Sequence, residues 1–206
     1  MKKLLFGGII VVACFSAPAS AAPAYNWTGF YAGVEGGGGW GRIGLDASFV
    51  DDAKLSGVLG GVQAGYNQQF GNWVVGVGAD INAANIRGSM NWGAEIYSGK
   101  INYFGAIEGR GGYLLKPDLL IYGTFGGAFA NVTAKVDAAP LSFEDKQTMT
   151  GWTVGAGIEY AVTPNISTFV QYKHFGLGST TFTLDDPASI HLKFDVVKGG
   201  FNFKFN

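Results

Sequence analysis

The chain has 206 residues and a formal net charge of -1, with charged residues at 14%, 34 glycines and 16 phenylalanines. So little charge and so much glycine are unlike the surface of an ordinary soluble domain, and glycine without a three-residue period excludes collagen. The linear sequence shows no basic patch or arm, which argues against nucleic acid as a partner. The length fits a single domain.

Residues 1–21 have the pattern of a secretory signal peptide. Lys2 and Lys3 form a charged start, Leu4 to Phe15 an apolar run, and Ala19-Ser20-Ala21 a small-residue cleavage site. We therefore expect cleavage after Ala21 and a mature domain over residues 22–206.

The only cysteine, Cys14, lies in this leader. Val11-Val12-Ala13-Cys14 resembles the lipobox of bacterial lipoproteins, so lipidation of Cys14 stays open as an alternative. A mature chain without cysteine has no disulfide, thiolate nucleophile or sulfur metal site.

After the leader no apolar run approaches the roughly 18 residues of a membrane helix. Instead, apolar and polar residues alternate with the two-residue period of a β-strand. The alternating segments, in chain order, are Trp27–Trp40, Leu55–Phe70, Trp73–Arg87, Lys100–Leu115, Leu119–Ala134, Met149–Ala161, Ile166–Phe175 and Ile190–Phe205.

In each segment we expect the apolar face to point outward and the polar face inward. Trp27–Trp40 sets Phe30 and Val34 against Glu35, and Met149–Ala161 sets Ile158 against Glu159. The same pattern puts the following residues outward: Val75, Val77, Ala79, Ile81, Ile101, Tyr103, Ile107, Tyr113, Ile121, Phe125, Phe129, Val170 and Tyr172.

The last segment changes phase along its length. Leu192 and Phe194 are out of step with Val197 and Phe201, which predicts a bulge or a change of environment near Asp195.

The connections alternate in length. Gly71-Asn72, Lys116-Pro117-Asp118 and Thr163-Pro164-Asn165 read as short turns. Long loops are predicted at Gly41–Lys54, Gly88–Gly99, Lys135–Thr148 and Gly176–Ser189. This alternation indicates an all-β fold, a transmembrane antiparallel up-and-down β-barrel of about eight strands with periplasmic termini.

Two soluble folds compete with this interpretation. A β-sandwich would scatter the aromatic residues through a core, and a lipocalin-like barrel would need an apolar interior. The leader, the alternating segments and the alternating connection lengths argue against the sandwich. An inward face of glycine, amide and charged residues argues against the lipocalin-like barrel. The barrel predicts membrane-interface girdles from the aromatic residues near the strand ends: Trp27, Trp40, Trp73, Tyr113, Trp152, Tyr160 and Phe205.

The inward face also carries charges of both signs. An interior of about eight strands is only wide enough for side chains to fill, so we expect these charges to pair and close the lumen. A narrow, intermittently open pore is the alternative. The predicted network comprises Glu35, Asp80, Glu108, Arg110, Glu159, Lys173, Lys198 and Lys204.

His174 and His191 are predicted to lie near the surface ends of the last two strands, beside Asp185 and Asp186. They could bind a metal or haem there or serve as the base of a membrane-embedded hydrolase, but two histidines without a third ligand make a weak site. We expect no catalytic residue, no metal site and no resident cofactor.

Four stretches resemble the outer-membrane immunogenic and haemin-binding protein family of Gram-negative bacteria. They begin at Trp27 (Trp-Thr-Gly-Phe-Tyr-Ala-Gly-Val), Gly61 (Gly-Val-Gln-Ala-Gly-Tyr-Asn), Gly151 (Gly-Trp-Thr-Val-Gly-Ala-Gly-Ile-Glu-Tyr) and Val197. Such proteins commonly end on an aromatic residue read by the assembly machinery, whereas here Asn206 follows Phe205.

The resemblance implies a small outer-membrane barrel; its members include surface antigens, envelope-stabilising proteins, haem binders and small porins. We expect a structural, surface-exposed role, with the outer-membrane bilayer, its lipopolysaccharide and the barrel-assembly machinery as partners. Haem capture or slow solute diffusion is the alternative, and an outer-membrane enzyme is a third.

Overall fold

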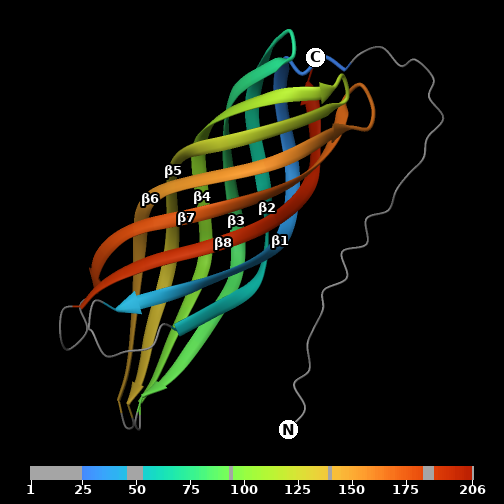
Figure 1. Ribbon diagram of the computed structural model, residues 1–206. Helices are drawn as coiled ribbons and strands as arrows, with labels where there is room; N and C mark the ends of the chain where they lie inside the picture. The colour runs from blue at the N-terminus through green and yellow to red at the C-terminus, as the bar shows by residue number, and fades with distance from the viewer. Residues whose placement is uncertain (1–24, 46–52, 93–94, 139–140, 183–187, 206) are drawn as a thin grey trace, which may run out of the picture.

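The computed structural model describes residues 25–45, 53–92, 95–138, 141–182 and 188–205. These residues form one closed antiparallel barrel in which each strand pairs with its neighbours in sequence and β1 pairs with β8 (Figure 1). The strands are β1 (Gly29–Leu45), β2 (Ala53–Phe70), β3 (Trp73–Trp92), β4 (Glu95–Lys116), β5 (Leu119–Ala138), β6 (Leu141–Ala161), β7 (Ile166–Phe182) and β8 (Ala188–Phe205). The predicted signal peptide, Cys14 and Asn206 lie outside the described residues. Within the described ranges, no helix is long and apolar enough to cross a bilayer.

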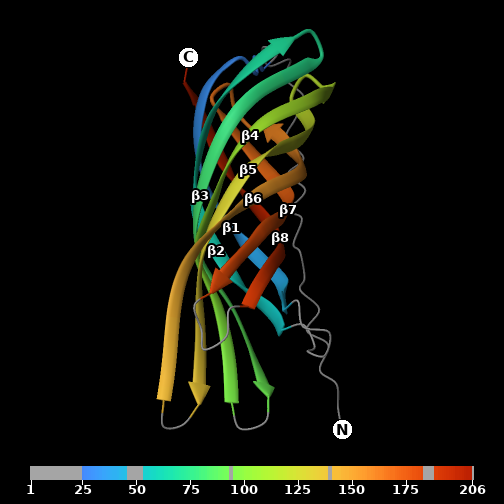
Figure 2. The same cartoon turned by 90° about the vertical axis from the view of Figure 1, so that its left-hand side faces the viewer.

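The two ends of the barrel differ. At one end, here called the turn end, lie the tight connections at residues 71–72, 117–118 and 162–165 and the end of β8. At the opposite hairpin end, β3 to β6 extend past their neighbours (Figure 2). There β3 stays paired with β4 as far as Trp92 and Glu95, and β5 with β6 as far as Ala138 and Leu141.

The long loops predicted at this end are therefore wrong in extent. Most of Gly88–Gly99 and Lys135–Thr148 is strand, and β1, β2, β7 and β8 take up much of Gly41–Lys54 and Gly176–Ser189. The physical reason is that a paired hairpin needs no apolar face once it has left the lipid, because its backbone hydrogen bonds are made within the sheet. Loss of apolar alternation marked the end of the membrane band, not the end of the strands.

The outward direction of the apolar faces is confirmed. Val34 is 60% exposed and Ile107 is 72% exposed, whereas Glu35 and Lys173 are buried inside the ring. A soluble protein would reverse this arrangement. A membrane-spanning barrel requires it, since its outer surface meets hydrocarbon.

One inversion occurs in β4. Ile101 was predicted to face outward with Tyr103, but it is fully buried while Tyr103 is exposed. Between them, two steps along β4 match a single step along β5, from Val132 to Asn131, so Asn102 is an extra residue. A β-bulge of this kind shifts the two-residue alternation by one position and turns Ile101 inward.

Near Asp195 the structure has a change of environment and no bulge. The pairing of β8 with β1 runs without interruption through this point, and the register shift between β7 and β8 lies farther on, between Leu177 and Thr180. Phe194 and Val196 are buried because the barrel interior itself becomes apolar at this level.

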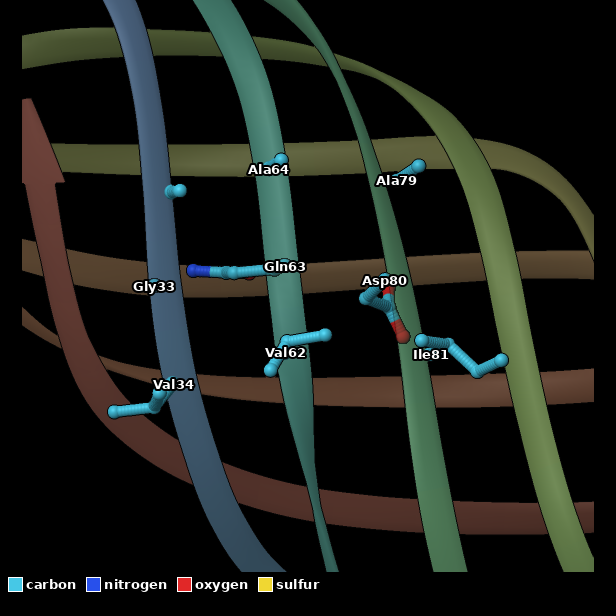
Figure 3. Close-up of a pocket in the computed structure, with 9 residues that line it drawn as sticks. Gly33, Val34, Val62, Gln63, Ala64, Ala79, Asp80 and Ile81 are labelled. Atoms are coloured by element: carbon cyan, nitrogen blue, oxygen red, sulfur yellow. The ribbon is translucent and has the colours of Figure 1, made fainter. Parts of the chain in front are cut away.

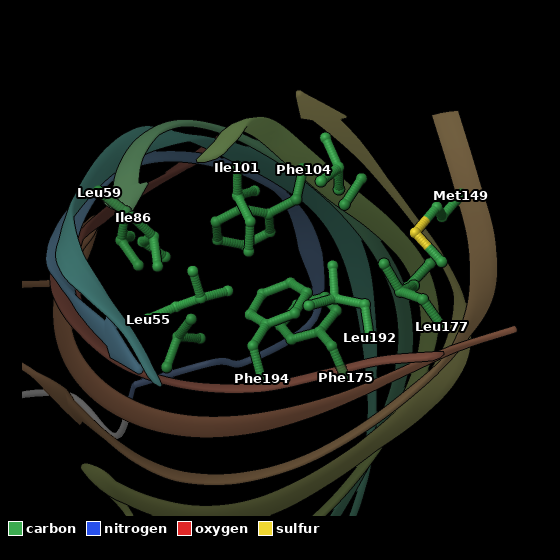
Figure 4. Close-up of a cluster of buried hydrophobic side chains, with 14 of the residues drawn as sticks. Leu55, Leu59, Ile86, Ile101, Phe104, Met149, Phe175, Leu177, Leu192 and Phe194 are labelled. Carbon is green, nitrogen blue, oxygen red and sulfur yellow. The ribbon is translucent and has the colours of Figure 1, made fainter. Parts of the chain in front are cut away.

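The interior is thus layered. A large apolar cluster fills it toward the hairpin end, with side chains from many strands meeting on the barrel axis (Figure 4). Phe104, Phe175 and Phe194 form its centre, the last two rings stacked with centroids 4.5 Å apart. A smaller cluster of Trp27, Val74, Leu114, Leu120, Tyr122 and Ala161 lies toward the turn end. The expectation of a purely polar inner face is therefore wrong at both ends.

Six of the seven predicted girdle residues are exposed on the outer face, and Trp27 is not. Trp27 is buried in the smaller apolar cluster, and its indole Nε1 donates a hydrogen bond to the carbonyl oxygen of Pro117 at 3.1 Å. Trp27 lies three positions before Phe30, so strand parity alone puts it on the opposite, inward side, and the prediction of a girdle position was wrong. Trp27 covers the turn end from within.

A charge on the outer face tests whether that face meets lipid. We expect Val62→Arg, near the middle of the apolar band on β2, to cost about 2–4 kcal/mol of folding free energy in vesicles. Ser56→Arg, on the same face of β2 but at the edge of the band, opposite Trp40, should cost at most about 1 kcal/mol. Urea titration of folding into phosphatidylcholine vesicles measures both; equal costs would contradict a lipid-facing Val62.

Candidate functional site

The candidate site is the polar layer inside the barrel, between the two apolar clusters. Inward positions of neighbouring strands supply it, and glycines beside them leave the room that long side chains need. At Gly155 an added Cβ would lie 2.9 Å from Cγ of Lys173 and 2.8 Å from the carbonyl oxygen of Tyr172. Any larger residue at Gly155 would displace the lysine stem or the backbone.

Two lysines hold three carboxylates in the first half of this layer, here called the lysine cluster. Lys173 Nζ lies 2.6 Å from Asp80 Oδ1 and 2.8 Å from Glu108 Oε1. Lys198 Nζ lies 2.8 Å from Glu35 Oε1 and 3.4 Å from Asp80 Oδ2. Asp80 therefore bridges the two ammonium groups, and all five side chains act as one unit.

Arg110 and Glu159 form the second half, here called the arginine cluster. Their ion pair is supported by the Ser167 hydroxyl, which donates to Glu159, and by Asn202 Nδ2, which lies 2.8 Å from Glu159 Oε1. The guanidinium of Arg110 also stacks on the Tyr122 ring, 3.7 Å from its centroid. A carboxylate with this many donors is held in one orientation.

Lys204 departs from the expected pairing of opposite charges. Its Nζ donates to the backbone carbonyl of Asn26 and lies 4.8 Å from the centroid of the Tyr25 ring. Tyr25, outside the membrane-spanning strands, is partly buried at the turn end, and this burial raises the pKa of its hydroxyl to about 12. Lys204 thus anchors the segment before β1 rather than neutralising an acid.

The electrostatics favour a rigid, filled interior. Lys173 and Lys198 are fully buried, so each would lose several kcal/mol of hydration energy without its partners. Three carboxylates face two ammonium groups, and Oε2 of Glu35 and of Glu108 has no hydrogen-bond partner. The layer offers fixed charges that hold one another in place.

Several interior partners were missed by sequence reasoning. Asn202, Gln63 and Ser167 join the network, with Gln63 Nε2 only 2.7 Å from Asn202 Oδ1. Their inward parity could have identified them, since each occupies the polar face of its strand. The stacking of Tyr122 on Arg110 had no such signal, because it depends on the register across the barrel.

The two histidines do not share a described site. His174 lies on the outer face, its Nδ1 2.7 Å from Asp195 Oδ1, and Tyr172 donates to the same oxygen at 2.6 Å. His191, on β8, pairs with Gly44 on β1 and lies four positions from Asp195. Its side chain lies outside the described residues, as do Asp185 and Asp186. In the described part of the chain, no three His, Cys, Asp or Glu residues gather as a metal site.

An open hollow lies on the barrel wall and extends over β1, β2 and β3 (Figure 3). Ala32, Ala64 and Ala79 are direct cross-strand neighbours there, flanked by the larger Val62 and Ile81. The small outward side chains explain the depression. Gln63 and Asp80 also line it, but their side chains bond inside the barrel, to Asn202 and to Lys173, so they do not converge on the hollow as a ligand pocket needs.

Breaking the lysine cluster should be costly. Lys173→Met keeps the side-chain volume but leaves Asp80 and Glu108 buried without their shared cation, so we expect a loss of about 3–5 kcal/mol in folding free energy. Lys116→Met, exposed at the turn end, should change it by less than about 0.5 kcal/mol.

The double variant Lys173→Met/Glu108→Gln should recover part of the loss, because one of the stranded charges is removed. Equilibrium unfolding in urea with vesicle-bound protein measures all three. Equal stability of the Lys173→Met and Lys116→Met variants would show that the interior does not depend on this pairing.

Haem binding by His174 and His191 stays a prediction. If the pair ligates haem iron, titration of refolded protein should give a shifted Soret band that disappears in His174→Ala/His191→Ala. A Soret shift of unchanged size in the double variant would discard both histidines as ligands.

Comparison with known proteins agrees with the barrel geometry. The 31 kDa outer-membrane immunogenic protein of Brucella melitensis is 34% identical over 220 residues, covering 95% of this chain and 91% of the relative. The 22 kDa outer membrane protein of Rhizobium leguminosarum bv. viciae is 35% identical over 171 residues, covering 81% and 72%.

Two solved structures share the fold. Neisserial surface protein A has a TM-score of 0.50 at 18% identity, covering 86% of this chain and 98% of that one. The outer membrane protein AlkL, solved in lipid bilayers, also has a TM-score of 0.50, at 15% identity, covering 93% and 96%. The model of the outer membrane protein beta-barrel domain matches residues 8–205. The chain therefore belongs to the outer membrane protein beta-barrel domain family, and it is an outer-membrane protein of Gram-negative type.

Proposed function

We propose that this protein is a non-conducting barrel with a structural and surface-exposed role in the outer membrane, and that it carries out no catalysis. The observation that supports this function is the filled interior. Paired charges occupy the middle of the lumen, and apolar clusters lie on both sides of them. A solute would have to displace fully buried side chains in three successive layers.

The turn end faces the periplasm in this proposal, and the hairpin end faces the cell exterior. Short periplasmic turns and longer external connections are the usual arrangement of such barrels. The extended β3–β4 and β5–β6 hairpins then rise above the membrane (Figure 2). Surface-exposed connections are where recognition by other molecules concentrates.

Immunogenic relatives fit this orientation. The Brucella melitensis relative is described as an outer-membrane immunogenic protein, and an extended external hairpin is the part of a barrel that antibodies can reach. We propose that the outer wall of the barrel contacts lipopolysaccharide of the outer leaflet. We also propose that the barrel-assembly machinery inserts the protein into the membrane.

Conductance measures whether the lumen is closed. We expect refolded protein in planar bilayers with symmetric salt to give a silent trace at protein amounts at which a porin opens in steps, since ions cannot pass the three filled layers. The Lys173→Met variant should also stay silent, because the two apolar clusters remain. Regular stepwise openings of the unmodified protein would replace the closed barrel with the narrow-pore alternative.

A further inference from the structure

The outer wall carries a sharply bounded apolar band. On β1 its exposed residues run from Phe30 to Trp40, and on β3 the same face runs from Trp73 to Ala83. Each of these stretches is about ten residues, the length at which a tilted strand crosses the hydrocarbon core. Trp40 therefore marks the level at which the outer leaflet's hydrocarbon ends and its headgroups begin.

Cations lie directly beyond this level. Arg42 is two residues past Trp40 on β1, on the same exposed face, and its cross-strand neighbours are Lys54 on β2 and Lys193 on β8. Arg87 on β3 continues the row, opposite Ser56 on β2 and Lys100 on β4. Five adjacent strands thus contribute to one basic belt, made of Lys193, Arg42, Lys54, Arg87 and Lys100.

The belt is not neutralised by the described part of the protein. Within it, Arg42, Lys54 and Lys193 make no ion pair, and like charges placed directly across strands repel one another. Asp195 faces the same way on β8, but it accepts hydrogen bonds from His174 and Tyr172. The cations inside the barrel differ from those of the belt, because each interior cation donates a hydrogen bond to a protein oxygen.

We propose that the basic belt binds the phosphate groups of lipopolysaccharide in the outer leaflet. This inference rests on the proposed function, since it takes the hairpin end to be external. Phosphorylated sugar headgroups are the dense anions at that depth, and several closely spaced cations can share one of them. The guanidinium of Arg42 binds phosphate in bidentate geometry, with an ammonium group on each side.

The test compares lipopolysaccharide binding by the refolded full-length protein and by Arg42→Gln/Lys54→Gln/Lys193→Gln. Binding of fluorescent lipopolysaccharide is titrated in zwitterionic detergent. We expect the triple variant to bind at least about tenfold more weakly, since three surface cations are removed. Lipopolysaccharide stripped of its phosphates should bind both proteins equally weakly.

Two controls separate charge from fold. The charge-preserving variant Arg42→Lys/Lys54→Arg/Lys193→Arg and the turn-end variant Lys116→Gln should both bind like the unmodified protein. Heat-dependent gel mobility reports that each barrel is folded, and the single variant Arg42→Gln replaces the triple variant if the latter fails to fold.

Binding of the triple variant within twofold of the unmodified protein, or undiminished binding of dephosphorylated lipopolysaccharide, would overturn the belt. Neither outcome bears on the proposal that the lumen is closed, because that proposal is tested separately by bilayer conductance.

Discussion

Closure of the hydrogen-bonded ring is the constraint on which the rest of this structure depends. In hydrocarbon an unpaired backbone N–H or C=O group costs several kcal/mol, so a sheet can cross a bilayer only if its edges meet. Here β8 pairs with β1 from Phe205 opposite Phe30 to Ile190 opposite Leu45. Once the ring is closed, each strand must offer one face to lipid and the other to a narrow interior.

That interior has to be filled, and the protein fills it in two ways. In the middle, long charged side chains reach across the barrel and satisfy one another, with Asp80 shared between Lys173 and Lys198. Toward each end, aromatic and aliphatic side chains pack instead, where Phe104 meets Phe175 and Phe194, and where Trp27 closes the turn end. The proposed structural role rests on this filling, because a solute would have to displace both charged and apolar layers to cross the barrel.

The outer wall is divided by depth in the same way. An apolar band ends at Trp40, a row of cations follows, and the paired hairpins extend past it. Interior charges hold one another, whereas the cations of the belt have no counter-ion in the described part of the chain. The envelope itself can supply one, which would tie the barrel to the leaflet that surrounds it.

Much of this architecture followed from the sequence alone, because strand parity is a local property. Alternation placed Val34, Ile107 and Ile158 outward and Glu35, Asp80 and Glu159 inward, and short turns at residues 71–72, 117–118 and 163–165 separated the pairs of strands. The same periodicity, with its scarcity of charge, was enough to predict a transmembrane barrel of about eight strands and the eight charges of its lumen.

Only the tertiary structure decided which residues share a level and meet across the barrel. The bulge at Asn102 turned Ile101 inward, the register brought Tyr122 onto Arg110, and the continued pairing of β3 to β6 made strands of segments predicted as loops. Parity tells which side of the wall a residue faces. The depth at which it lies, and whether that depth is lipid, headgroup or apolar interior, depends on register and barrel closure, which are set by contacts far apart in the chain.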